Sequence, residues 1–104
     1  MSIPQQGDVW WADYEEEKRR PVLVLTRSHA IPVLKRVVVA PVSRTVRGIP
    51  TEIGLGPSEG LAIDCVASFD NLQTILRSML TERTGTLGSR REEIWQALRA
   101  LVDC

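Results

Sequence analysis

The chain has 104 residues, of which 43% are hydrophobic and 25% charged, and its net charge is zero. These values are typical of one small globular domain, which we expect to span residues 1–104, and they disfavour nonspecific binding to duplex nucleic acid. No apolar run reaches the roughly 20 residues that a membrane-spanning helix needs, and the N-terminus lacks the basic and apolar regions of a secretory signal. We therefore expect a cytoplasmic protein that makes no membrane contact.

The charges are distributed unevenly along the chain. Residues 1–17 carry five acidic side chains and no basic one, whereas residues 18–51 carry eight basic side chains and no acidic one. Such a segment can supply the positive surface that an anionic polymer needs. Alternatively, the same basic residues lie scattered over separate solvated faces.

Few side chains are available for a metal site. The chain has one histidine and two cysteines, without the spacing of metal ligands. We expect no metal and no cofactor, and we expect Cys65, which lies in an apolar stretch, to be a buried thiol.

The first half of the chain favours β-strands. Gly7-Asp8 precedes an apolar segment, Val9–Tyr14, whose alternation places Trp10 and Trp11 on opposite faces of a strand, with at least one of them in the core. A charged loop is expected over Glu15–Arg20. Two buried β runs follow, Val22–Leu25 and Val37–Ala40, and Pro41 favours an edge, a bulge or a turn at the end of the second.

The second half continues with short elements separated by turns. The sequence predicts a loop over Ser43–Pro50, a strand over Thr51–Leu55, a turn over Gly56–Gly60, a strand over Leu61–Phe69, a helix or strand over Leu72–Leu80, and a last strand over Thr84–Gly88.

The C-terminal segment is the one predicted helix. Ser89 and Glu92 have the spacing of a capping box, and an apolar stripe follows at Ile94, Leu98, Leu101 and Val102. The sequence thus predicts an α+β, β-dominant fold, a small antiparallel barrel with a C-terminal helix.

Several short motifs occur in an order that resembles the MazF/PemK toxin family over nearly the whole chain. They are Gly7-Asp8-Val9-Trp10, Arg20-Pro21-Val22-Leu23-Val24, Val39-Ala40-Pro41-Val42-Ser43, Pro50-Thr51-Glu52-Ile53, Gly60-Leu61 and Asp70-Asn71-Leu72-Gln73-Thr74-Ile75. Each motif alone is weak, but their combination at this length is specific.

The resemblance implies an SH3-like barrel of the MazF/PemK/CcdB type that forms homodimers with RNA-binding grooves along the subunit interface. It also implies the toxin of a type II toxin–antitoxin system, whose cognate antitoxin is acidic and partly disordered. The implied activity is a sequence-selective, metal-independent endoribonuclease that cleaves single-stranded RNA through 2′-OH attack and leaves a 2′,3′-cyclic phosphate.

The family's catalytic pair carries over to Arg20 and Ser43. An arginine matches phosphate oxygens bidentately and remains charged, which suits transition-state stabilisation. Asp70 aligns with a carboxylate that acts as a base in some members. The position two residues earlier, where those members carry an arginine, is Ser68 here, so Asp70 could instead shape the groove. A carboxylate of the charged loop, Glu15–Glu17, is a further candidate base.

RNA contacts are expected from side chains on either side of the catalytic pair. They are Lys18, Arg19, Arg44, Thr45 and Arg47, with Trp11 as a candidate base-stacking residue.

Two other functions remain open from the sequence. One is a noncatalytic, CcdB-like toxin that poisons gyrase, which the Arg20 and Ser43 pairing disfavours. The other is an SH3-like RNA-binding or adaptor module without turnover. Arg20→Ala that abolishes cleavage while retaining RNA binding would distinguish the enzyme from such a module.

Overall fold

The computed structural model describes residues 3–15 and 18–103. Its strands are β1 (Asp8–Tyr14), β2 (Lys18–Val24), β3 (Arg36–Ser43), β4 (Glu52–Leu55), β5 (Cys65–Ser68), β6 (Gln73–Leu76) and β7 (Leu80–Thr86). One α-helix, α1 (Glu92–Val102), follows them. Short 3₁₀ turns occupy Ile31–Val33, Pro57–Glu59, Phe69–Asn71, Arg77–Met79 and Gly88–Arg91.

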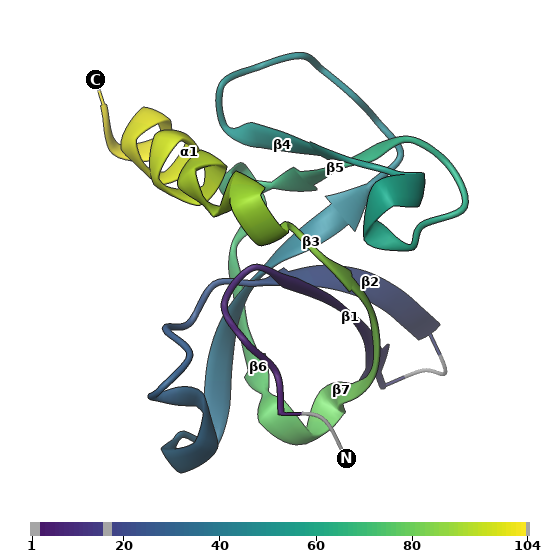
Figure 1. Cartoon of the computed structure of the whole chain (residues 1–104), viewed down its shortest axis with the longest axis vertical. Helices are drawn as coiled ribbons and strands as arrows, with labels where there is room; N and C mark the ends of the chain where they lie inside the picture. The colour runs from purple at the N-terminus through teal and green to yellow at the C-terminus, as the bar shows by residue number, and fades with distance from the viewer. Residues whose placement is uncertain (1–2, 16–17, 104) are drawn as a thin grey trace.

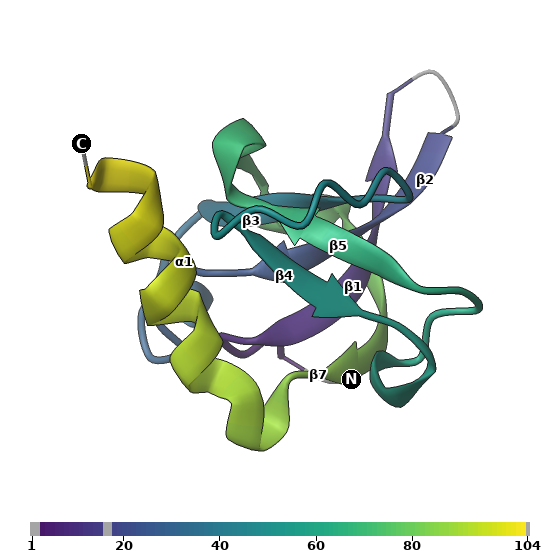
Figure 2. The ribbon, with the colours of Figure 1, turned by 90° about the horizontal axis from the view of Figure 1, so that it is seen from above.

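The strands form one antiparallel sheet in the order β4-β5-β3-β2-β1-β7. The sheet curls into a half-barrel, and α1 lies beside β4 at one end (Figures 1 and 2). The long strand β3 pairs with β6 over Arg36–Val39 and with β5 over Val42–Ser43. Pro41, which has no N–H to donate, lies where β3 changes partner. The predicted β-dominant α+β fold is confirmed.

Alternation along the strands divides the core into two clusters on opposite sides of the sheet. Val9 and Leu23 belong to the cluster that also packs against α1, whereas Trp10 and Val22 belong to the second cluster, over β3 and β6. Trp10 is 5% exposed and Trp11 is only partly buried. The prediction that these two tryptophans lie on opposite faces, with one in the core, is therefore confirmed.

The C-terminal helix is confirmed, but its predicted capping box is wrong. Ser89 lies in the 3₁₀ turn Gly88–Arg91, and the cap position, Arg91, makes no side-chain hydrogen bond to the helix. Ion pairing replaces the cap: the Arg90 guanidinium donates to both carboxylate oxygens of Glu93, in the first turn, at 2.7 and 3.0 Å.

Only part of the apolar helix stripe is buried in the single chain. Ile94 and Ala97 are each 1% exposed, whereas Trp95 is 51% and Val102 is 76% exposed. Among the described residues, no helix is long and apolar enough to cross a membrane.

Three predicted boundaries are wrong. Lys18–Arg20 belong to β2 and not to a loop, because β2 pairs with β1 as far as Tyr14 opposite Lys18. Of Leu61–Phe69, only Cys65–Ser68 form a strand. Leu72–Leu80 contains β6 and a 3₁₀ turn, and the last strand begins at Leu80 and not at Thr84.

Candidate active site

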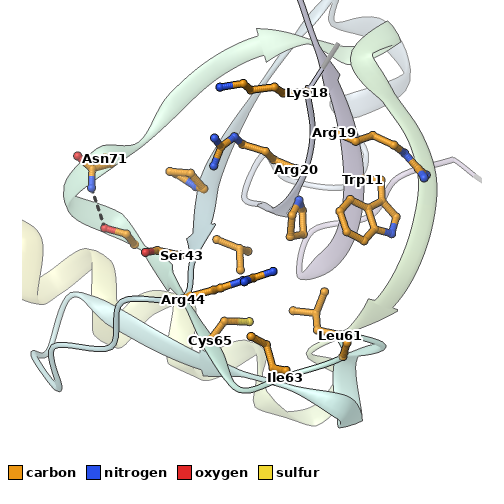
Figure 3. A pocket seen from close by; sticks show the side chains of 15 residues that line it. Trp11, Lys18, Arg19, Arg20, Ser43, Arg44, Leu61, Ile63, Cys65 and Asn71 are labelled. Atoms are coloured by element: carbon orange, nitrogen blue, oxygen red, sulfur yellow. Dashed lines mark hydrogen bonds between the residues drawn. The ribbon is translucent and has the colours of Figure 1, made fainter. Parts of the chain in front are cut away.

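An open groove of about 820 Å³ lies where the end of β3 meets the β1–β2 hairpin and the segment that leads into β5 (Figure 3). Its lining residues are Trp11, Lys18, Arg19, Arg20, Pro21, Pro41, Val42, Ser43, Arg44, Leu61, Ala62, Ile63, Cys65, Ser68 and Asn71.

Strand register brings Arg20 and Ser43 together. In the antiparallel pair of β2 and β3, Val22 lies opposite Pro41 and Leu23 opposite Ala40. The β2–β3 pairing ends at Val22 and Pro41, so Arg20 and Ser43 each lie two residues beyond the last paired position, at the same end of the two strands. Both side chains line the same groove (Figure 3).

Ser43 is oriented by its own loop. The backbone N–H of Thr45 donates to Ser43 Oγ at 3.0 Å. A hydroxyl has one proton to donate and two lone pairs, so the Ser43 proton stays available to an acceptor in the groove.

The described residues of the groove lining are strongly positive. They include four cations, Lys18, Arg19, Arg20 and Arg44, and no carboxylate. Arg19 is already neutralised: it pairs with Glu82 at 2.7 Å and with Asp13 at 3.5 Å. Its guanidinium also lies 5.0 Å from the centre of the Trp11 ring, so Trp11 is partly covered by a cation.

Burial raises the pKa of two side chains near these cations. Burial raises the pKa of Tyr14, while the nearby Arg20 charge acts in the opposite direction. The Tyr14 hydroxyl donates to Gln73 Oε1 at 2.7 Å. Burial also raises the pKa of Cys65, with the negative charges of Asp64 and Glu59 adding to it, so Cys65 remains a protonated, buried thiol as expected.

Asp70, Thr45 and Arg47 are not among the residues that line the groove. Asp70 Oδ2 accepts a hydrogen bond from Thr51 Oγ1 at 2.7 Å. Arg47 Nη1 lies 4.0 Å from Glu52 Oε2. The groove lining thus contains Arg20, Ser43 and four of the predicted RNA contacts, whereas Asp70, Thr45 and Arg47 lie outside it.

A comparison with protein families assigns residues 5–102 to the model of the "PemK-like, MazF-like toxin of type II toxin-antitoxin system". The chain belongs to this family. The family predicted from the sequence is confirmed, and the CcdB-like alternative falls away.

Individual relatives agree with the family assignment. The chain is 38% identical to the "Probable endoribonuclease MazF5" of Mycobacterium tuberculosis, over 99% of this chain and 96% of the relative. It is 37% identical to the "Probable endoribonuclease MazF2" of the same organism, over 96% of this chain and 99% of the relative.

Solved structures agree as well. The "Mycobacterium tuberculosis toxin MazF-mt6" superposes with a TM-score of 0.84 at 37% identity, covering 92% of this chain and 96% of that one. An "Endoribonuclease in complex with its cognate antitoxin from Mycobacterial species" superposes with a TM-score of 0.80 at 25% identity, covering 95% and 94%.

The candidate site of this MazF-like chain also contains residues that sequence reasoning missed. Asn71 lines the groove and donates to Ser68 Oγ at 3.1 Å, and Leu61–Ile63 form an apolar wall (Figure 3). Asn71 stands in a motif that supported the family resemblance, beside Asp70, but its type alone predicts no role. The apolar wall was predicted to be a strand, because apolar runs favour strands.

Of the three glutamates in the charged segment that are candidates for the base, only Glu15 lies in the part of the chain that the structure describes. Glu15 is exposed, whereas Glu16 and Glu17 lie outside the described residues. Within the described ranges, no three histidine, cysteine or acidic side chains gather in a way that could hold a metal ion.

Proposed function

We propose that this MazF-like chain is a sequence-selective endoribonuclease that cleaves single-stranded RNA without a metal ion. The observation that carries the proposal is the convergence of Arg20 and Ser43 in a cationic groove. A groove of this kind accommodates a phosphodiester, and the named endoribonuclease relatives match nearly the whole chain.

The chemistry follows from the substrate's own 2′-OH. Its oxygen attacks the adjacent phosphorus, the 2′,3′-cyclic phosphate forms, and the bond from phosphorus to the 5′ oxygen breaks with protonation of the leaving oxygen. Negative charge accumulates on the nonbridging oxygens during attack, and donors aimed at that charge lower the barrier. Arg20 is suited to this role because its guanidinium is planar, bidentate and permanently charged.

Ser43 acts as a second donor in this proposal. Because its Oγ already accepts the Thr45 N–H, its own proton is directed to a phosphate oxygen or to the 2′-OH. Arg44 and Lys18 then bind the flanking phosphates, and the apolar wall Leu61–Ile63 packs against a base. Arg47 and Thr45, on the loop after Arg44, would contact RNA that extends beyond the groove.

We assign Asp70 a supporting role. Its carboxylate accepts from Thr51 Oγ1 and does not line the groove, so it fixes the turn that carries Asn71. The groove-lining side chains within residues 3–15 and 18–103 include no carboxylate or histidine to accept the 2′-OH proton. The three glutamates Glu15–Glu17, of which the last two lie outside the described residues, are the remaining candidates for the base.

The proposed partners are a second copy of the chain and an acidic antitoxin. The exposed Trp95, Leu101 and Val102 on α1 offer an apolar face for dimerisation, and the cationic groove suits an acidic segment. A mycobacterial endoribonuclease related to this chain has been solved with its cognate antitoxin. We place the protein in the cytoplasm, where RNA is its substrate. A monomer in sedimentation equilibrium at micromolar concentration would contradict the dimer.

The deciding experiment is RNA cleavage by the purified chain, free of antitoxin, in excess EDTA. A long single-stranded RNA is expected to yield discrete fragments that end in 2′,3′-cyclic phosphate. A 2′-deoxy nucleotide at the cut position should block cleavage there, because the attacking hydroxyl is missing.

Arg20→Ala is the matched variant in this assay. It should abolish detectable cleavage while still binding the 2′-deoxy RNA, which separates an enzyme from a binding module. Intact RNA with folded wild-type protein would disprove the proposal.

A further inference from the structure

The base of the loop 44–51 holds a buried carboxylate that the proposed mechanism does not use. The Glu52 side chain is only 3% exposed. Its Oε1 accepts the backbone N–H groups of both Arg47 and Gly48 at 3.0 Å, and its own N–H donates to Ile49 O at 3.1 Å. The Glu52 side chain therefore holds the backbone of the loop at Arg47 and Gly48, and the Glu52 backbone holds it at Ile49.

The second oxygen of Glu52 is less satisfied. Glu52 Oε2 is buried and has no hydrogen-bond partner among the described residues. The Arg47 guanidinium lies 4.0 Å away, beyond hydrogen-bond distance. Burying a carboxylate with one oxygen unpaired costs free energy, which the two backbone N–H bonds to Oε1 and the nearby Arg47 charge offset.

The loop that Glu52 organises joins two walls of the groove. Its start follows Ser43 and carries Arg44, which extends into the groove (Figure 3). At its end, Thr51 O accepts the Phe69 N–H at 2.9 Å and Thr51 Oγ1 donates to Asp70. The turn Phe69–Asn71 brings Asn71 into the groove lining. The loop conformation thus fixes where Arg44 stands relative to Asn71.

We propose that Glu52 is a positioning residue that holds the loop 44–50 in the conformation that reads RNA, and thereby determines which nucleotides beside the cleaved bond are accepted. The inference rests on the proposed ribonuclease function. Arg44 and Arg47 belong to a loop whose backbone Glu52 holds in place. The surface that binds RNA is therefore formed before binding, and less binding free energy is lost to ordering of the loop.

The anchoring is tested first on the protein alone, by limited trypsin digestion and intact-mass analysis. Trypsin cleaves after Arg44 and Arg47, and its rate follows the population of the open loop. In Glu52→Ala we expect cleavage at these two sites to be about tenfold faster, because two hydrogen bonds to a charged acceptor are lost. Glu52→Gln keeps a carbonyl acceptor for both N–H groups and should stay within about threefold of wild type.

Glu59→Gln is the matched control. Glu59 is also buried, at 4% exposed, and its Oε1 accepts a backbone N–H, that of Gly56 at 2.8 Å, but it organises a different turn. Its substitution should lower the melting temperature without changing trypsin cleavage after Arg44 and Arg47.

The effect on RNA is measured by mapping cut positions on a long RNA and by kinetics on a short preferred one. Glu52→Ala should cut at additional positions and raise KM about tenfold with a smaller change in kcat, whereas Glu52→Gln and Glu59→Gln should retain the wild-type map. An unchanged trypsin rate in Glu52→Ala would overturn the anchoring. Faster digestion with an unchanged cut map and KM would overturn the positioning role. RNA left intact by wild type would instead remove the proposed function and the RNA role with it, while the trypsin result still decides the anchoring.

Discussion

At the scale of single residues, the groove separates two kinds of arginine. Arg19 is held by Glu82 and Asp13 and covers Trp11, so its charge is already balanced. Arg20, one position later on β2, has no ion pair within the described residues, and lines the groove together with Ser43. Adjacent strand residues point to opposite faces, which is why neighbours of identical type have different environments.

The geometry of Arg20 matters as much as its charge. Arg20→Lys keeps a cation but replaces a planar bidentate donor with a single point charge. We expect kcat to fall by about 100-fold, within the range for loss of one transition-state donor, with KM changed by less than about threefold. Single-turnover cleavage of a short RNA measures this effect. A kcat near that of wild type would show that only the charge of Arg20 is needed.

Sequence reasoning identified the proposed catalytic pair but not the residues that we propose support it. Arg20 and Ser43 stand in motifs that only a family resemblance made interpretable, since Arg-Pro and a strand-end serine occur by chance in many proteins. Asn71 and Glu52 belong to the same set of motifs, yet their roles depend on burial and on partners distant in sequence. Nothing in the residue type of Glu52 predicts that its carboxylate is enclosed.

At the scale of elements, hydrophobic runs predicted where most strands lie, but they did not predict the charged residues at the strand ends. The core of β2 was predicted from Val22–Leu25, but Lys18–Arg20 carry no apolar pattern and join the strand only by pairing with β1. Conversely, Leu61–Ile63 are apolar but form no strand: Leu61 packs in the core and Ile63 is exposed at the groove. In both cases the structure depends on contacts with residues distant in sequence, and a local sequence pattern does not reveal those contacts.

The start of α1 offers a pH-dependent test. The hydrogen bond and charge of Arg90 hold the pKa of Glu93 below its ordinary value. A lowered folded-state pKa contributes stability that is fully present above the unfolded-state pKa, near 4.3, and is lost as pH falls through the folded value. Glu93→Gln should therefore be less stable than wild type at pH 7, by about 0.5 kcal/mol for a partly exposed pair.

Thermal unfolding between pH 7 and pH 2.5 measures the difference. The gap in melting temperature between wild type and Glu93→Gln should narrow below about pH 4.3 and close at the acid end. Glu92→Gln, in the same helical turn but exposed and without a described ion pair, is the control. A gap that is independent of pH would show that the Arg90 pair does not stabilise the helix.

At the scale of the whole molecule, a neutral chain has concentrated positive charge on one surface. The net charge is zero, yet Lys18, Arg20 and Arg44 share the groove without an ion pair among the described residues. RNA binding should therefore depend on a few local contacts and not on long-range attraction.

The salt dependence of RNA binding tests this arrangement. If these three cations each neutralise one phosphate, log K should fall with log salt with a slope of about −2, at about −0.7 for each phosphate of a single strand. Fluorescence anisotropy with a 2′-deoxy analogue measures the slope, and Arg44→Ala should make it shallower by about 0.7. A much steeper slope for wild type would indicate many contacts outside the groove.

The position of Trp11 beneath Arg19 has an optical consequence. Indole emission responds to a charge held over the ring, and the three tryptophans occupy distinct environments: Trp10 in the core, Trp95 on the exposed helix and Trp11 at the groove. A ligand that moves Arg19 is expected to change the emission of Trp11, and Trp95→Phe would remove the solvent-exposed contribution. The protein thus carries an intrinsic fluorophore through which occupation of the groove, and its release, can be followed in real time without a label.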